Sequence, residues 1–158
     1  MKRGFTLIEL TVTLALVAVT MGLVVVRLSW GSPRQQTIAA ARQLGAVMCL
    51  YREKAMAEEC LYAVRLEGDT GRYTVSKPAE RSAAAAQQAQ ALKSGRLGES
   101  LLFGAVSVQG TALQSPATLF LDGRSIGADA SIEVVSAKGP VVTVRLDPVL
   151  GEAEYDER

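Results

Sequence analysis

The N-terminal part of the sequence contains a long apolar run. None of the 17 residues at positions 10–26 is charged, and Glu9 is the only charge between positions 5 and 26. At about 1.5 Å per helical residue, a helix over positions 5–26 would extend roughly 33 Å, which is enough to cross a bilayer core. Lys2 and Arg3 precede the run, so the positive-inside rule places the N-terminus in the cytoplasm. The run therefore predicts a single membrane-spanning helix with the rest of the chain on the far side.

Two ordinary kinds of apolar segment are alternatives. A secretory signal has an apolar core of roughly 7–15 residues followed by a small-residue cleavage site. This run is longer, and no such site follows it. An uncleaved signal anchor is the second alternative. Neither explains Glu9, because a carboxylate at the bilayer centre costs on the order of 2.5–3.5 kcal/mol on insertion scales.

The residues around Glu9 form a recognisable motif. The stretch KRGFTLIEL at positions 2–10 resembles the class III signal of type IV pilins and of the pseudopilins of type II secretion systems. The resemblance implies that a prepilin peptidase cuts between Gly4 and Phe5 and that the new amine of Phe5 is methylated. It also implies an assembly role for Glu9, which can pair with the Phe5 amine of another subunit and so offset the cost of two buried charges. The predicted domains are a leader peptide (1–4), a transmembrane and assembly helix (5–30) and a periplasmic pilin-like domain (31–158).

A second helix is predicted from near Pro33 to Ala57 or Glu59. Ser32 suits an N-cap, Pro33 suits the first helical position, and Gln35 completes a capping box. Apolar residues then recur with helical periodicity and should pack on a sheet; they are Ile38, Ala41, Leu44, Val47, Met48, Tyr51 and Ala55.

The remaining sequence is typical of β-structure. Strands are predicted at positions 60–66, 72–76, 101–108, 118–121, 132–136 and 141–146, with turns at 67–71 and 137–140. Positions 78–99 are rich in alanine and glutamine, and either a short helix or a mobile surface loop is expected there. The order of these motifs resembles the GspH/FimT type of minor pilin. The fold class is therefore α+β and pilin-like: a long N-terminal helix, membrane-spanning in its first half, packed on a C-terminal antiparallel β-sheet domain.

Composition argues against most catalytic and metal sites. The chain has no histidine and only two cysteines, which excludes histidine-based catalysis and a four-thiolate zinc site. The C-terminal carboxylates have no recognised calcium-loop pattern and are interpreted as a solvated acidic end; they are Asp147, Glu152, Glu154, Asp156 and Glu157. We expect no catalytic residues, no metal site and no cofactor, and hence no enzyme.

Cys49 and Cys60 lie on the second helix and at the first strand. Once exported, they would meet an oxidising compartment and could form a disulfide. Two thiols in the core between helix and sheet are the alternative, because sequence does not fix the Cα separation.

Three functions remain open. The resemblance favours a minor pseudopilin that helps push folded proteins across the outer membrane by type II secretion. The alternatives are a minor pilin of a type IV pilus, acting in adhesion, motility or DNA uptake, and an enzyme or receptor on a pilin-like anchor. Nucleic-acid binding is not expected, because the net charge is +1 and the tail is acidic. The implied partners are other pseudopilins, the prepilin peptidase and the inner-membrane secretion platform. The implied location is the inner membrane, single-pass, with a periplasmic C-terminal domain.

Overall fold

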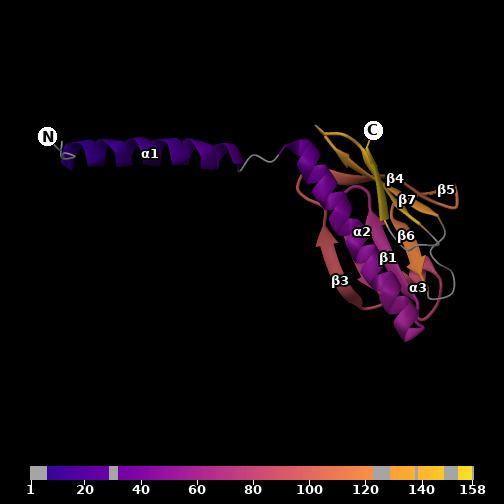
Figure 1. Cartoon of the computed structure of the whole chain (residues 1–158). Helices are drawn as coiled ribbons and strands as arrows, with labels where there is room; N and C mark the ends of the chain where they lie inside the picture. Colours follow the sequence, from indigo (N-terminus) through magenta and orange to yellow (C-terminus); the bar gives the residue numbers. More distant parts are fainter. Residues whose placement is uncertain (1–6, 29–31, 123–128, 138, 148–152, 158) are drawn as a thin grey trace. The chain divides into compact units, whose positions relative to one another are not determined.

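The computed structural model describes residues 7–28, 32–122, 129–137, 139–147 and 153–157. The chain divides into two units, Met1–Ser32 and Pro33–Arg158. The described part of the first unit is one helix, α1 (Leu7–Leu28). The second unit holds the other elements (Figure 1).

Within its described residues, the second unit combines two helices with nine short strands. Helix α2 spans Pro33–Glu58 and helix α3 spans Ala83–Gln88. The strands are β1 (Tyr62–Glu67), β2 (Arg72–Ser76), β3 (Ala91–Arg96), β4 (Leu101–Val108), β5 (Thr111–Leu113), β6 (Ala117–Leu121), β7 (Ala130–Ser136), β8 (Val142–Leu146) and β9 (Ala153–Glu157).

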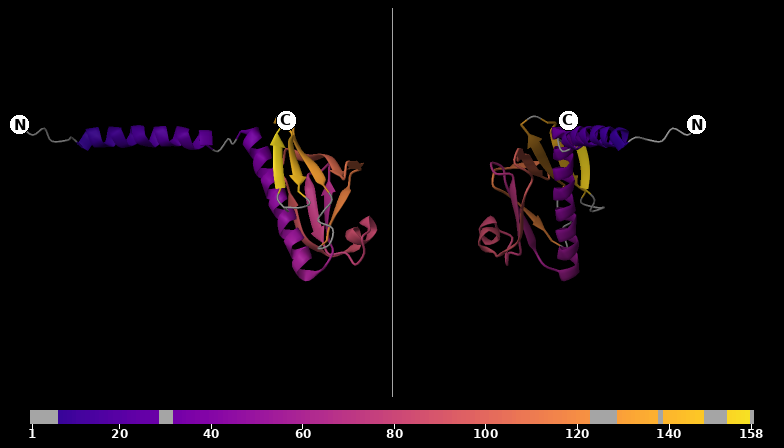
Figure 2. Two further views of the ribbon diagram at one scale, coloured as in Figure 1. Left: turned by 45° about the vertical axis from the view of Figure 1, so that its right-hand side comes forward. Right: turned by 90° about the vertical axis from the view of Figure 1, so that its left-hand side faces the viewer.

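The strands form two antiparallel sheets. One sheet has the order β3-β2-β1-β6 and the other has the order β5-β4-β7-β8-β9. Helix α2 contacts β1 and β6 of the first sheet and β7, β8 and β9 of the second, so it lies across both (Figures 1 and 2). The prediction of a helix packed on antiparallel β-structure is confirmed, whereas the division into two sheets was not predicted.

The apolar stripe of α2 meets the sheets as predicted. Leu44 and Met48 are fully buried, and Ile38 is only partly buried at the edge of the core. The helix begins at Pro33, whose missing N–H would have had no intrahelical partner. It ends with Glu59 at a positive φ of 50° and a bond from the Cys60 N–H to the Ala55 carbonyl (3.2 Å). This is a Schellman-type ending, with glutamate in the position that glycine usually takes.

Alternation along the strands supplies the rest of the core. In β6, Ala117, Leu119 and Leu121 are buried and the residues between them are half-exposed. Such a pattern is expected of an antiparallel strand that faces a core on one side only. The predicted hairpins β1–β2 and β7–β8 are both present.

Three strands fall outside the predicted set. Positions 78–99 contain the short helix α3, which was one of the two predicted alternatives for this segment. They also contain strand β3, which was not predicted. Strand β5 follows a two-residue turn at Gln109-Gly110, whose φ angles of 51° and 75° match a type I′ turn. Strand β9 lies in the tail that is interpreted as a solvated acidic end; residues 154–157 are indeed exposed, but the pairing of Ala153–Glu157 with β8 was not predicted.

Candidate assembly site

The predicted processing and assembly residues lie at the start of the chain. Gly4 and Phe5 fall outside the described residues, so cleavage and N-methylation there stay predictions. Glu9 lies in the first turns of α1, and its side chain is exposed. The assembly role of Glu9 also stays a prediction.

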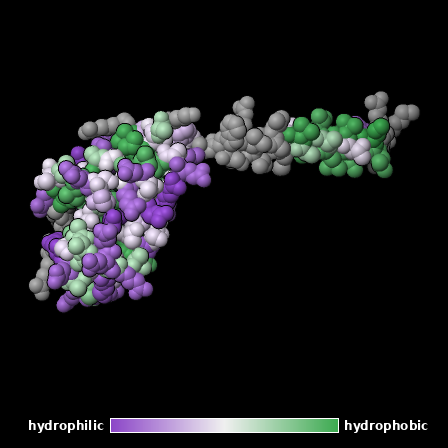
Figure 3. Space-filling model, turned by 180° about the vertical axis from the view of Figure 1, so that it is seen from behind, coloured by the Kyte–Doolittle hydropathy of each residue, from purple (hydrophilic) through white to green (hydrophobic). Residues whose placement is uncertain are grey.

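Helix α1 exposes large apolar side chains over positions 7–19. Leu7 is 81% exposed, Ile8 71% and Val19 63%. Figure 3 shows the coloured part of α1 mostly in green, the colour of hydrophobic residues, with paler atoms between. Exposed apolar surface of this extent marks a segment that is covered by lipid or protein. By length and hydropathy together, however, no helix within the described residues qualifies as a membrane span.

The hydroxyl groups of α1 bond to the helix itself. Thr11 Oγ1 donates to the Ile8 carbonyl (2.9 Å), and Thr13 Oγ1 contacts the carbonyls of Glu9 and Leu10 (3.0 and 2.9 Å). Bonds of this kind, reaching back three or four residues, are a regular alternative for threonine within a helix. They leave the surface of α1 more apolar than its threonine content suggests.

The two cysteines are not bonded to each other. Cys49 and Cys60 both carry thiols and both are partly buried at the edge of the core. Burial raises the pKa of the Cys49 thiol. The structure therefore contains the alternative of two thiols and not the disulfide.

A cluster of hydrogen-bonded polar side chains lies at the C-terminal end of α2. Glu58 Oε2 accepts hydrogen bonds from Tyr62 Oη (2.8 Å) and Lys77 Nζ (3.0 Å). These bonds, that from Tyr62 first, hold the pKa of Glu58 below its ordinary value, and the bond to Glu58 raises the pKa of Lys77. The cluster joins α2 to β1 and to the residue after β2. Its partners satisfy one another, which indicates a structural role.

The acidic C-terminal strand is attached to α2 at two points. Arg34 donates two hydrogen bonds to the carboxylate of Glu157, from Nε to Oε1 (2.6 Å) and from Nη2 to Oε2 (2.8 Å). This bonding lowers the pKa of Glu157. Further along, a Cβ placed on Gly45 would collide with Tyr155 Oη and lie 2.9 Å from Ala153 Cβ. Glycine at position 45 therefore lets β9 approach the helix closely.

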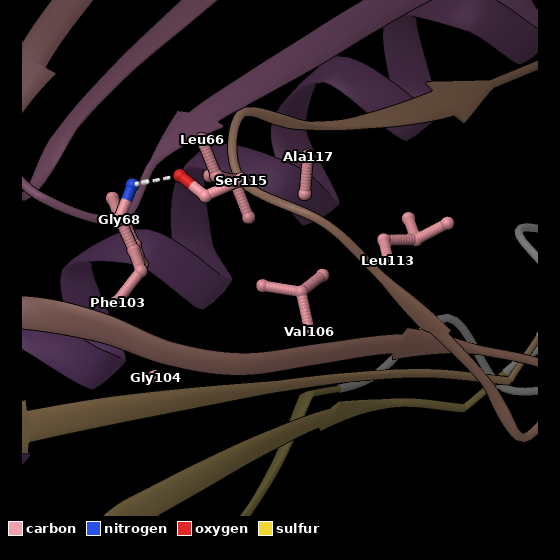
Figure 4. A pocket seen from close by; sticks show the side chains of 8 residues that line it. All are labelled: Leu66, Gly68, Phe103, Gly104, Val106, Leu113, Ser115 and Ala117. Carbon is pink, nitrogen blue, oxygen red and sulfur yellow. Dashed lines mark hydrogen bonds between the residues drawn. The ribbon is translucent and has the colours of Figure 1, made fainter.

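A small hollow lies between the two sheets. Its volume is about 20 Å³, roughly the room that one water molecule needs. Leu66 and Ala117 line it from the first sheet, and Phe103 and Val106 line it from the second (Figure 4). On one side Ser115 Oγ accepts a hydrogen bond from the Gly68 N–H (3.0 Å). The hollow was not predicted, because it depends on how the two sheets meet.

Among the described residues, no group of three or more histidine, cysteine, aspartate or glutamate side chains could hold a metal ion. An open hollow of about 310 Å³ beside the first half of α2 is lined by alanine and glutamine from the helix and by positions 97–101. Glu99 is the one titratable residue in that lining.

Comparison with known proteins adds evidence at three levels. Residues 1–25 match the prokaryotic N-terminal methylation motif. Over 68 residues the chain is 33% identical to the type II secretion system protein H of Pseudomonas aeruginosa, a match that covers 43% of this chain and 40% of that protein. The chain thus matches well under half the length of this relative.

Two solved structures of the minor pseudopilin EpsH, from the type II secretion system of Vibrio cholerae, resemble this one. Each has a TM-score of 0.59 and 15% sequence identity; one alignment covers 76% of this chain and 94% of the other, and the second covers 80% and 98%. At this identity the likeness establishes the pilin-like α+β fold. The predicted resemblance to the GspH type of minor pseudopilin is therefore confirmed by the N-terminal motif, by the matched relative and by the fold.

Proposed function

We propose that this protein is a minor pseudopilin, a structural and non-enzymatic subunit of the type II secretion pseudopilus that helps push folded proteins across the outer membrane. The observation that carries the proposal is a methylation motif at residues 1–25 followed by the fold of a minor pseudopilin. A secretory signal or an ordinary membrane anchor would require neither feature.

In this proposal α1 has two successive environments. Before assembly it spans the inner membrane, with the N-terminus in the cytoplasm and the second unit in the periplasm. The prepilin peptidase cuts after Gly4, and the amine of Phe5 is methylated. In the filament, the exposed apolar side chains of α1 pack against the helices of other pseudopilins above the inner-membrane secretion platform.

Glu9 fixes the register between neighbouring subunits. In a helix that continued to Phe5, four residues of helical rise would separate Glu9 from the Phe5 amine of its own chain by about 6 Å along the axis. The amine of a staggered neighbour is the cation that it meets on assembly. Pairing in an apolar surrounding favours one register, because any other register leaves a charge without a counter-charge.

The test compares Glu9→Ala with wild type in cells that carry the secretion system. We expect normal membrane insertion, because the substitution removes a charge from an apolar helix. We also expect weaker cross-linking to the other pseudopilins and reduced export, with Glu9→Asp only partly restoring both. Thr11→Ala is the matched control, since it changes a neighbouring polar residue on the same helix and should assemble normally.

Processing is measured in the same cells. Intact-mass analysis should find a mature chain that starts at N-methyl-Phe5, whereas Gly4→Val should leave the precursor uncut because the peptidase requires a small residue. Normal cross-linking and export by Glu9→Ala, or a mature wild-type chain that retains residues 1–4, would contradict the proposal.

A further inference from the structure

The outer face of the four-stranded sheet forms a surface that the proposed function does not use. In β1, Val64 and Leu66 face the core, whereas Arg65 between them is half-exposed on the other side. Helix α3 covers one end of this outer face, where the buried hydroxyl of Ser76 donates to the Ala86 carbonyl (3.0 Å). At the opposite end of the face, the side chains of Arg72 and Arg96 are exposed.

Three arginines gather at this open end. The strand register places Arg72 of β2 directly opposite Arg96 of β3, and Arg65 of β1 diagonal to Arg72 on the same face. Directly opposed residues have Cβ atoms about 4.5–5.5 Å apart, and diagonal neighbours are about 7–8 Å apart. One carboxylate, that of Glu67 opposite Arg72, shares the cluster.

The three arginines are balanced by little opposite charge in the described structure, where Glu67 opposite Arg72 is the one carboxylate of the cluster. None of the three is in an ion pair there, since the pairs found use Arg34, Lys77 and Arg81. Arg96 donates from Nε to the Thr70 carbonyl (3.0 Å). Like charges directly opposite each other destabilise a sheet. The pair Arg72–Arg96 is therefore a local cost that a bound anion would remove.

Strand β3 beside this cluster is an edge strand. It lies at the end of its sheet and pairs only with β2 among the described strands. Its side chains are largely exposed, including Leu92 at 51%. The free edge presents backbone N–H and C=O groups to which an extended chain can add.

We propose that this surface binds an extended acidic segment of a partner protein, which adds to the free edge of β3 and places carboxylates on Arg72 and Arg96. Guanidinium groups bind carboxylates through paired, charge-assisted hydrogen bonds, which accounts for arginine at both positions. A free sheet edge recognises a polypeptide backbone, which a phosphate polymer lacks, and this favours a protein partner. The inference does not depend on filament assembly.

The test uses the full-length protein in non-ionic detergent and a fluorescent peptide of alternating glutamate and threonine. Binding is measured by fluorescence anisotropy. We expect Arg72→Gln/Arg96→Gln to bind about tenfold more weakly or worse, since hydrogen bonds to charged groups are among the stronger ones. The matched control Arg42→Gln/Lys54→Gln also removes two positive charges, but from exposed positions of α2. It should bind the peptide as wild type does.

Strand addition is tested on the wild-type protein with two N-methylated peptides. One is methylated at its odd-numbered residues and the other at its even-numbered residues. One of the two should lose about tenfold or more in affinity, because the partner's N–H groups that face β3 are then blocked. This arm does not depend on the folding of any variant. The melting temperature of Arg72→Gln/Arg96→Gln should stay close to that of wild type, because the lost repulsion between the two arginines is opposed by the lost bond from Arg96 to Thr70 and the lost attraction of Arg72 to Glu67.

Three results would overturn the proposal. The first is equal peptide binding by Arg72→Gln/Arg96→Gln and wild type. The second is undiminished binding of both N-methylated peptides. The third is displacement of the labelled peptide by polyphosphate or duplex DNA at a lower concentration of negative charge than unlabelled peptide requires. That result would identify a general polyanion surface.

Discussion

Helices α1 and α2 have similar lengths, 22 and 26 residues, but place their apolar side chains in opposite surroundings. In α2 the apolar residues form one stripe, and Leu44 and Met48 on it are fully buried against the sheets. In α1 the large apolar residues from Leu7 to Val19 are exposed. Packing within the second unit accounts for the sequence of α2, whereas under the proposed function lipid and neighbouring subunits account for that of α1.

The largest expected effect comes from truncating matched leucines in the two helices. Leu44→Ala should lower the unfolding free energy of the second unit by about 2–5 kcal/mol, because it removes a fully buried side chain. Leu14→Ala, at a position 61% exposed, should change it by less than about 0.5 kcal/mol. Denaturant unfolding in detergent, followed by the near-ultraviolet circular dichroism of the core tyrosines, measures both. A comparable loss from Leu14→Ala would mean that α1 packs on the second unit.

An intermediate effect is expected at the contact between α2 and β9. Gly45→Val should destabilise the second unit by about 1–3 kcal/mol, because its side chain would overlap Tyr155 and Ala153. Hydrogen exchange should then increase in β9 more than in β7. Ala46→Val, at an exposed position on the same helix, is the control. Unchanged protection of β9 in Gly45→Val would show that the strand does not depend on this close approach.

The smallest effect concerns pH. The folded-state pKa of Glu157 lies below its ordinary value, so the stabilisation by Arg34 is present above about pH 4.3 and is lost as the pH falls through the lower folded-state value. Because both groups are at the surface, the loss should be small. Melting temperatures of wild type and Arg34→Gln should therefore differ more at neutral pH than in acid. A difference independent of pH would assign the effect of Arg34 to something other than its charge.

Many helices and strands of the second unit could be predicted because their apolar periodicity and their ends are visible in the local sequence. Strand β2 and strand β4 have the predicted bounds, and α2 ends within the predicted range, at a C-terminus where Cys60 bonds back to Ala55. These elements combine a clear apolar period with flanking turn or cap residues.

Two of the three missed strands, β3 and β9, depend on residues outside their own sequence. Strand β3 has little apolar character of its own, and it lies where the ring of Tyr73 occupies the space above Gly95. Strand β9 is mostly polar, but Glu154 lies opposite Arg145 and Tyr155 fits over Gly45. Gly45 and Tyr155 are 110 residues apart, and no window of local sequence contains both of them.

The threonines of α1 have a consequence for transport between environments. The hydroxyl of Thr20, like those of Thr11 and Thr13, has its acceptors in the preceding turn, the Leu16 and Val17 carbonyls at 3.0 and 2.9 Å. A helix that carries its own hydrogen-bond acceptors has no partners to exchange when it passes from lipid into a filament. For these side chains, the energy difference between the two media then reduces to dispersion contacts. Under the proposed function, the move of α1 from the bilayer into the filament is therefore nearly neutral at these threonines, and the energetic cost of that step falls on the charged group, Glu9.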